Sequence, residues 1–265
     1  MAERELHAYY ARDEERDRLA SGVGLVEFVR TVEVLERTLP APSAVIADVG
    51  GGPGRYTDWL VDRGYDVAHR DLVAHHVEQV RDRHGARVNS ATGDARALDL
   101  DDDAFDAVLL LGPLYHLEDP DDRLLALREA RRVVRPGGRV YAAAISRFAP
   151  RLDGMLVQRF HLKYPVMADM VDDAERTGRM RPVHEAGFNG YAHTPEDFRD
   201  EMMASGLVLE SLVSLESVAF ALCDLDARLD DPSERALLLD VLRAVESVPS
   251  LLGVGPHMLA TARKG

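Results

Sequence analysis

The chain has 265 residues, of which 46% are hydrophobic and 29% are charged, and its net charge is −14. These values are typical of a globular protein with a sizeable core, and the sequence contains no internal repeat and no low-complexity linker. So acidic a surface repels the phosphate backbone of nucleic acid, and a single cysteine, Cys223, excludes an internal disulfide and a four-cysteine zinc site.

No apolar run approaches the ~18 residues that a bilayer-spanning helix needs. The first residues, Met1-Ala2-Glu3-Arg4-Glu5, do not resemble a signal peptide. We therefore expect a cytoplasmic protein with neither a membrane nor a nucleic-acid partner.

Residues 1–39 carry apolar side chains at helical spacing. The sequence Ser21-Gly22-Val23-Gly24 interrupts this pattern and predicts two helices, the second of which ends before Pro40. Tyr9 and Tyr10, in the first helix, either reach a ligand site or pack in the core.

A predicted buried strand over residues 44–49 ends in a loop rich in glycine. Asp48 lies at the end of the strand, four of the five residues 50–54 are glycine, and a helix is predicted over residues 54–63. Glycines before a helix N-terminus let the backbone approach a ligand closely. A dinucleotide fingerprint, G-x-G-x-x-G, does not fit, because Arg55 or Thr57 occupies the place of its last glycine.

The second predicted strand ends on Asp71, at the edge of the sheet where open α/β folds bind ligands. Asp71 either binds a ligand there or caps the next helix. His69, His75 and His76 lack the spacing of a helical metal site, so we expect them to face solvent and predict no metal site.

Further strands are predicted over residues 87–91, 105–111 and 140–145, with a helix over 121–135. The first of these strands leads into Gly93-Asp94-Ala95, and the second leads into Gly112-Pro113-Leu114-Tyr115-His116. His116 at this edge is either a base that acts near neutral pH or a packed side chain.

Residues 147–193, here called the cap segment, combine helical spacing with a stretch rich in glycine, histidine and aromatic residues. A helix begins after Thr194, which is its predicted N-cap. A strand over 207–213, a helix over 233–248 and a last strand from His257 complete the chain.

The motif Asp48-x-Gly50-x-Gly52-x-Gly54 resembles the first motif of the class I S-adenosylmethionine-dependent methyltransferases. The phrase Leu-x-Glu-Ala-x-Arg-Val-Val-x-Pro-Gly-Gly, from Leu127 to Gly138, is similar to a second hallmark of that family. The resemblance covers about residues 43–146 and 194–263. It implies an α/β, Rossmann-like fold with a doubly wound seven-stranded sheet whose last strand is antiparallel.

In this family the glycine loop wraps the methionine end of the cofactor, the acid after strand 2 holds the ribose hydroxyls, and the Gly-Asp-Ala turn meets the adenine. The resemblance thus implies the following cofactor-binding residues: Asp48, Gly50, Gly51, Gly52, Gly54, Asp71, Leu72, Gly93, Asp94, Ala95 and Leu111. Tyr115 and His116 are the candidate catalytic residues.

The resemblance implies three parts: N-terminal helices over 1–39, a cofactor-binding core over 40–146 and 194–265, and the mainly helical cap segment, inserted over an acceptor pocket.

The resemblance also implies transfer of a methyl group from S-adenosylmethionine to an O, N or C atom of a small molecule, leaving S-adenosylhomocysteine. The alternatives are a non-catalytic cofactor-binding protein and an NAD-dependent oxidoreductase. Ten polar and aromatic side chains of the cap segment are expected to hold a polar or anionic acceptor, among them Arg147, Arg151 and His193.

Overall fold

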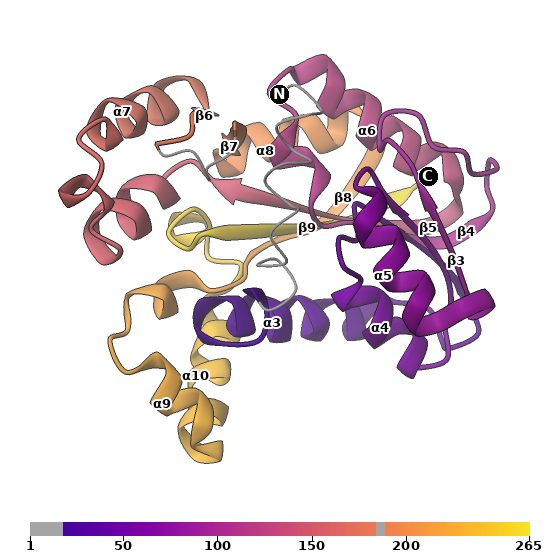
Figure 1. Cartoon of the computed structure of the whole chain (residues 1–265), viewed down its shortest axis with the longest axis horizontal. Helices are drawn as coiled ribbons and strands as arrows, with labels where there is room; N and C mark the ends of the chain where they lie inside the picture. The colour runs from indigo at the N-terminus through magenta and orange to yellow at the C-terminus, as the bar shows by residue number, and fades with distance from the viewer. Residues whose placement is uncertain (1–17, 184–188) are drawn as a thin grey trace.

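The computed structural model describes residues 18–183 and 189–265 (Figure 1). The strands are β1 (Val45–Val49), β2 (Asp66–Asp71), β3 (Val88–Thr92), β4 (Phe105–Leu110), β5 (Val134–Ser146), β6 (Arg179–Met180), β7 (Gly190–His193), β8 (Leu207–Ser214) and β9 (His257–Lys264). The α-helices are α3 (Gly22–Thr38), α4 (Arg55–Asp62), α5 (Ala74–His84), α6 (Pro120–Val133), α7 (Met167–Thr177), α8 (Pro195–Ala204), α9 (Leu225–Asp230) and α10 (Pro232–Val245). Short helical segments include η2 (Pro113–His116), η3 (Pro150–Val157), η4 (Phe160–Leu162) and η5 (Ser217–Ala221).

Strands β3, β2, β1, β4 and β5 lie side by side in that order and are all parallel. Strand β9 runs antiparallel between β5 and β8. The predicted antiparallel last strand is confirmed, and these seven strands are present. The described sheet has nine strands rather than seven, because β7 pairs with the end of β5 and β6 pairs with β7. A parallel sheet of this kind places the carboxyl ends of β1, β2 and β4 at one edge, which is where the site forms.

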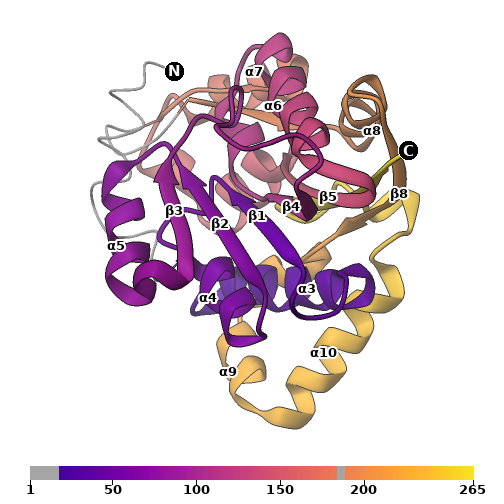
Figure 2. The same cartoon turned by 90° about the vertical axis from the view of Figure 1, so that its right-hand side faces the viewer.

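Helices cover both faces of the sheet (Figure 2). On one face, side chains of α3, α4 and α5 pack against the sheet, with Leu35, Leu60 and Val80 fully buried. On the other face, Leu127 of α6 and Phe198 of α8 are fully buried. Burial on both faces explains why the central strands are almost wholly apolar.

The helix predicted in the second half of residues 1–39 is α3, which begins at Gly22 and packs through Val26 against α9 and α10. Tyr9 and Tyr10 lie outside the described residues.

The cap segment carries η3, η4 and α7, and then the antiparallel pair β6 and β7, which adds to the sheet through pairing of Ile145 with Ala192. His184, Gly187 and Phe188 lie outside the described residues. Within the described ranges, no helix is both long enough and apolar enough to cross a bilayer.

Strand β5 begins at Val134, six residues before the predicted start. Phe105 pairs with Val134 and Ala107 pairs with Arg139, so the register shifts between these pairs. The segment Pro136-Gly137-Gly138 therefore forms an irregularity within the strand, where glycine tolerates a φ of +79° at Gly137.

Candidate functional site

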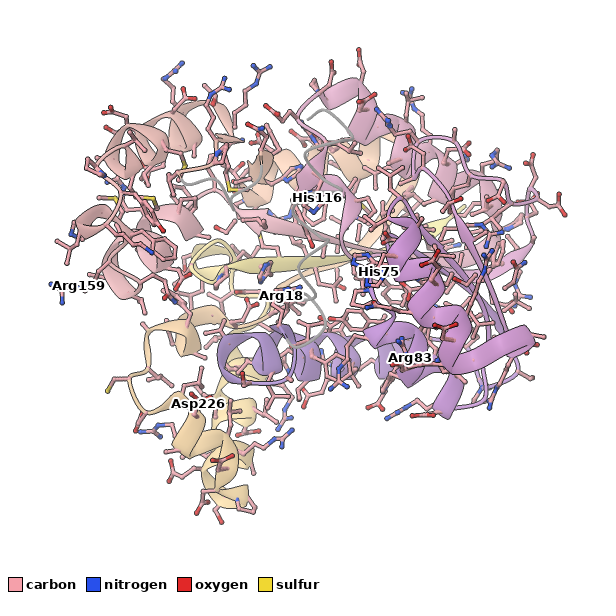
Figure 3. All side chains as sticks on the ribbon, viewed as in Figure 1. Arg18, His75, Arg83, His116, Arg159 and Asp226 are labelled. Atoms are coloured by element: carbon pink, nitrogen blue, oxygen red, sulfur yellow. The ribbon has the colours of Figure 1, made fainter. Side chains whose placement is uncertain are left out.

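A cavity lies at the carboxyl ends of β1, β2 and β4, and with its open mouth it encloses about 1050 Å³. Twelve of the predicted site residues line it: Asp48, Gly50, Gly51, Gly52, Asp71, Leu72, Gly93, Asp94, Ala95, Leu111, Tyr115 and His116. The labelled side chains of Arg18 and His116, which also line the cavity, lie near the middle of the molecule in Figure 3.

The glycine loop, residues 50–54, needs glycine for different reasons at different positions. Gly50 and Gly52 have φ values of +66° and +56°, which L side chains rarely adopt. A Cβ on Gly50 would lie 2.4 Å from Pro113 Cγ, whereas a Cβ on Gly52 would meet no protein atom within 4 Å. Gly52 therefore leaves open a space that a ligand can occupy.

Gly54 was predicted to bind the cofactor, but it is not among the residues that line the cavity. Its φ is +91°, and an added Cβ would lie 2.6 Å from Val80 Cγ2 of α5. Gly54 thus allows close packing of α4 and α5 behind the loop.

Asp48 is the second-last residue of β1 and is almost fully buried, with 1% exposure. Thr57 Oγ1 of α4 donates a hydrogen bond to Asp48 Oδ2 over 2.7 Å. Burial raises the pKa of the Asp48 carboxyl above its ordinary value. The side chain thus links the end of the strand to the helix that follows the loop.

Asp71 accepts hydrogen bonds through both carboxylate oxygens. Gly52 N–H donates to Oδ2 and Val73 N–H donates to Oδ1, each over 2.8 Å, and His76 Nδ1 lies 3.1 Å from Oδ1. Burial alone would raise the pKa of Asp71, but the bonds from His76 and the two amides outweigh it, so the pKa lies below its ordinary value. Asp71 is therefore an ionised carboxylate in the cavity wall.

The prediction that His69, His75 and His76 face solvent is wrong for two of them. His69 is fully buried and His76 is 3% exposed, whereas His75 is exposed. His69 is buried because β2 is covered on both faces, and His76 because its ring turns toward Asp71. The spacing of these residues along the chain indicates neither the burial of His69 nor the contact of His76 with Asp71.

The Gly93–Ala95 turn follows β3 and lines the cavity. Its Asp94 carboxylate forms an ion pair with Arg96, which in turn pairs with Asp122 of α6. The bond from Arg96 holds the pKa of Asp94 below its ordinary value. Arg96 also lines the cavity, although no sequence motif pointed to it.

Tyr115 and His116 of η2 form one wall of the cavity, and their ring centroids are 4.7 Å apart. Enclosure by the surrounding protein lowers the pKa of His116 to about 3. The imidazole is therefore neutral at neutral pH.

The sequence did not single out Arg18 and Glu27, which line the cavity from the start of the described chain and from α3. They form an ion pair, and Glu27 also lies 3.6 Å from His257 of β9, which donates to Glu216 over 2.7 Å. Burial alone would lower the pKa of His257, but the two carboxylates raise it to about 9. Ligand atoms of Glu27, Glu216 and His257 lie within 4.8 Å of one another, yet Arg18 and protonated His257 balance both carboxylates without a metal ion.

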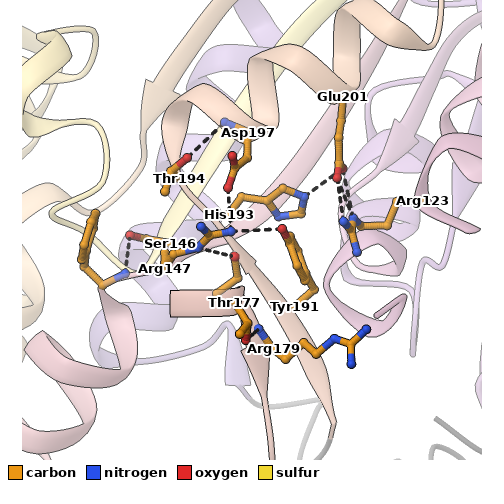
Figure 4. A network of polar contacts seen from close by, with 12 residues as sticks. Arg123, Ser146, Arg147, Thr177, Arg179, Tyr191, His193, Thr194, Asp197 and Glu201 are labelled. Atoms are coloured by element: carbon orange, nitrogen blue, oxygen red, sulfur yellow. Dashed lines mark hydrogen bonds and ion pairs between the residues drawn. The ribbon is translucent and has the colours of Figure 1, made fainter. Parts of the chain in front are cut away.

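A buried ion network includes Arg123, Tyr191, His193 and Glu201 (Figure 4). Arg123 of α6, 1% exposed, donates to Leu117 O over 2.8 Å and pairs with Glu201 of α8 over 2.7 Å. His193 of β7 lies 3.0 Å from the Glu201 carboxylate, and the Arg123 guanidinium lies over the Tyr191 ring at 3.6 Å. The network ties α6, α8 and the cap strand β7 to the segment that follows His116.

The described cap residues, which were predicted to hold the acceptor, lie away from the wall of this cavity. None of residues 147–183 and 189–193 lines the cavity. Arg147 pairs with Asp197, and Arg151 pairs with Asp172 and Glu175. These arginines are engaged by acidic side chains because the chain has a large excess of carboxylates.

Residues 47–142, which contain β2 to β4, most of β1 and most of the cavity wall, match the methyltransferase domain family. Over 108 residues the chain is 36% identical to an uncharacterised methyltransferase of Mycobacterium tuberculosis, an alignment that covers 41% of this chain and 42% of that protein. The chain thus spans about two fifths of the length of that curated relative.

Solved structures match over most of the chain. A Thermotoga maritima S-adenosylmethionine-dependent methyltransferase, described as a possible histamine N-methyltransferase, superposes with a TM-score of 0.61 at 18% identity, covering 98% of this chain and 100% of that one. The 1,6-didemethyltoxoflavin-N1-methyltransferase of Burkholderia thailandensis, with S-adenosylhomocysteine bound, gives a TM-score of 0.56 at 18% identity and covers 96% and 82%. The fold is that of the class I S-adenosylmethionine-dependent methyltransferases.

Proposed function

We propose that the protein transfers the methyl group of S-adenosylmethionine to an O, N or C atom of a small molecule bound beside Tyr115 and His116. The observation that carries the proposal is that the acid-glycine loop, Asp71 and the Gly93–Ala95 turn line one cavity with these two side chains. Three chain segments that the resemblance assigns to one cofactor therefore converge.

The residues present suit this cofactor. Gly52 leaves space for a ligand against the backbone, and Asp71 offers an ionised carboxylate to ribose hydroxyls. Asp94 and Ala95 would hold the adenine, and Gly50 to Gly52 the methionine end. When bound, the cofactor supplies a methyl group on a sulfonium, which is already a good leaving group.

The work left to the chain is alignment and exclusion of water. Leu111, Pro113 and Leu117 give the wall near His116 an apolar character. With a pKa of about 3, His116 is a weak base but a good hydrogen-bond acceptor, so we assign it the role of orienting the acceptor.

Calorimetry with S-adenosylhomocysteine tests the cofactor assignment, with NAD as the matched control. We expect micromolar affinity for the first and no binding of the second. A preference for NAD would overturn the assignment in favour of an oxidoreductase.

A screen of metabolite mixtures with S-adenosylmethionine, with S-adenosylhomocysteine release as the readout, tests turnover. Release that depends on both an acceptor and the protein supports methyl transfer. Tight binding of S-adenosylhomocysteine with no release in any mixture would favour a non-catalytic cofactor-binding protein.

A further inference from the structure

Two side chains of β2, those of Asp71 and His69, contact the backbone N–H and C=O of Gly52. Gly52 N–H donates to Asp71 Oδ2 over 2.8 Å, and Gly52 C=O lies 3.0 Å from His69 Nε2. His69 and Asp71 are two residues apart on one strand, so their side chains point to the same face. The glycine loop is therefore fixed to β2 at the residue that borders the open ligand space.

The other side of the His69 ring is anchored in β3. His69 Nδ1 lies 2.9 Å from Ser90 Oγ, and the imidazole is fully buried. A carbonyl oxygen only accepts hydrogen bonds, so Nε2 carries the proton in the neutral ring. Nδ1 then accepts from the Ser90 hydroxyl over 2.9 Å, in preference to Val77 O, which lies 3.4 Å from the same hydroxyl. Burial also lowers the pKa of His69, which favours this neutral form.

We propose that His69 is a positioning residue for the cofactor: its neutral imidazole bridges Ser90 and the Gly52 carbonyl and holds the glycine loop in its binding conformation before the ligand arrives. The identity of the ligand rests on the proposed function; the positioning role rests on the contacts of His69.

Holding the loop matters because Gly52 has a positive φ, and a chain freed there has other conformations available. If only part of the population has the binding conformation, the apparent affinity falls by that fraction. His69 raises affinity in this way without touching the ligand, since it is not among the residues that line the cavity.

Two substitutions of His69 by an amide residue test the contacts of Nε2 and Nδ1 separately. In His69→Gln the amide nitrogen can take the place of Nε2 and donate to Gly52. In His69→Asn the shorter amide takes the place of Nδ1 and reaches only Ser90. Both variants bury one amide in the same space, so they are matched in burial.

Calorimetry with S-adenosylhomocysteine is the readout, with the melting temperature of each variant measured without ligand. We expect His69→Asn to weaken binding at least fivefold and His69→Gln to stay within twofold of wild type. Equal affinities in the two variants, even with equally lowered melting temperatures, would show a purely structural role and overturn the proposal.

A measurement on the wild-type protein covers the case in which a variant does not fold. In ¹⁵N-histidine NMR spectra we expect His69 as the Nε2–H tautomer, whereas an Nδ1–H tautomer would overturn the proposal. If wild type does not bind S-adenosylhomocysteine at all, the proposed function fails, and the tautomer measurement still tests the contact to Gly52.

Discussion

Gly52 lines the cavity and has a positive φ of +56°, and a Cβ added there would meet no protein atom within 4 Å. We expect Gly52→Val to abolish binding of S-adenosylhomocysteine in calorimetry, because the branched side chain would fill the ligand space. Gly85→Val is the matched control: its φ is +54°, a Cβ there also meets no atom within 4 Å, and it lies away from the cavity. Equal loss of binding in both variants would assign the effect to backbone strain instead.

Asp71 both anchors Gly52 and faces the cavity. We expect Asp71→Ala to weaken S-adenosylhomocysteine binding about ten- to a hundredfold, since hydrogen bonds to a charged group contribute roughly 1.5–3 kcal/mol. Asp66→Ala, at the exposed start of the same strand, should bind like wild type. An unchanged dissociation constant for a folded Asp71→Ala variant would contradict the assignment.

His116 is assigned to the acceptor, so its loss should affect rate more than cofactor affinity. We expect His116→Ala to lower turnover about ten- to a hundredfold, since an unmet hydrogen bond costs ~1–3 kcal/mol. Affinity for S-adenosylhomocysteine should stay within a few-fold. Because the pKa of His116 is about 3, wild-type rates should show no inflection from this residue between pH 5 and 8. An inflection near pH 6.5 that His116→Ala removes would identify it as a general base.

Where a motif is local, the sequence predicts which residues line the cavity. Asp48 lies near the end of β1, and Gly52 and Asp94 come shortly after β1 and β3, so predicting the strands places all three at one edge of the sheet. The burial of His69 was not predicted from the sequence, because it depends on strands and helices from elsewhere in the chain that cover β2. Glu27 was not predicted for a related reason. Helical spacing shows which residues share a face of α3, but it does not show which part of the protein packs against that face.

At the scale of elements, the network around Arg123 joins α6, α8 and β7. Arg123→Met would leave the partly buried Glu201 carboxylate without its main partner, and breaking a buried pair typically costs 3–5 kcal/mol. We expect a loss of about that size in the free energy of unfolding in urea. Arg151→Met, which removes surface ion pairs with Asp172 and Glu175, should cost less than about 1 kcal/mol. Similar losses in the two variants would contradict the structural importance of the network.

The parallel strands and their helices were predictable because each element has its own periodicity and end signal. Thr194, for example, is the N-cap of α8 and accepts from Asp197 N–H, as predicted. The hairpin of β6 and β7 was not predictable in this way. Strand β6 has only two residues, Arg179 and Met180, too few for any alternation, and its pairing comes from contact with β7.

At the scale of the whole molecule, contacts distant in sequence close the fold around the cavity. Glu27 of α3 and His257 of β9 are 230 positions apart, yet they meet beside Glu216. Arg30 of α3 likewise pairs with Glu246, which follows α10. These ion pairs join the first described helix to the last elements of the chain, so the cavity wall at Glu27 depends on the complete fold.

The stabilisation that the contacts of His257 with Glu27 and Glu216 provide should depend on pH, because His257 titrates. Its pKa is raised from 6.5 to about 9 in the folded protein, so the folded state holds the proton more tightly than the unfolded chain. The resulting stabilisation is complete below about pH 6.5 and is lost as the pH rises through 9; a shift of this size corresponds to about 3 kcal/mol at most. We expect the free energy of unfolding in urea to fall by up to that amount between pH 7 and 10. His257→Asn keeps a donor near Glu216 but cannot titrate, so its stability should change much less over this range. An equally steep decline in His257→Asn would show that other groups cause the pH dependence.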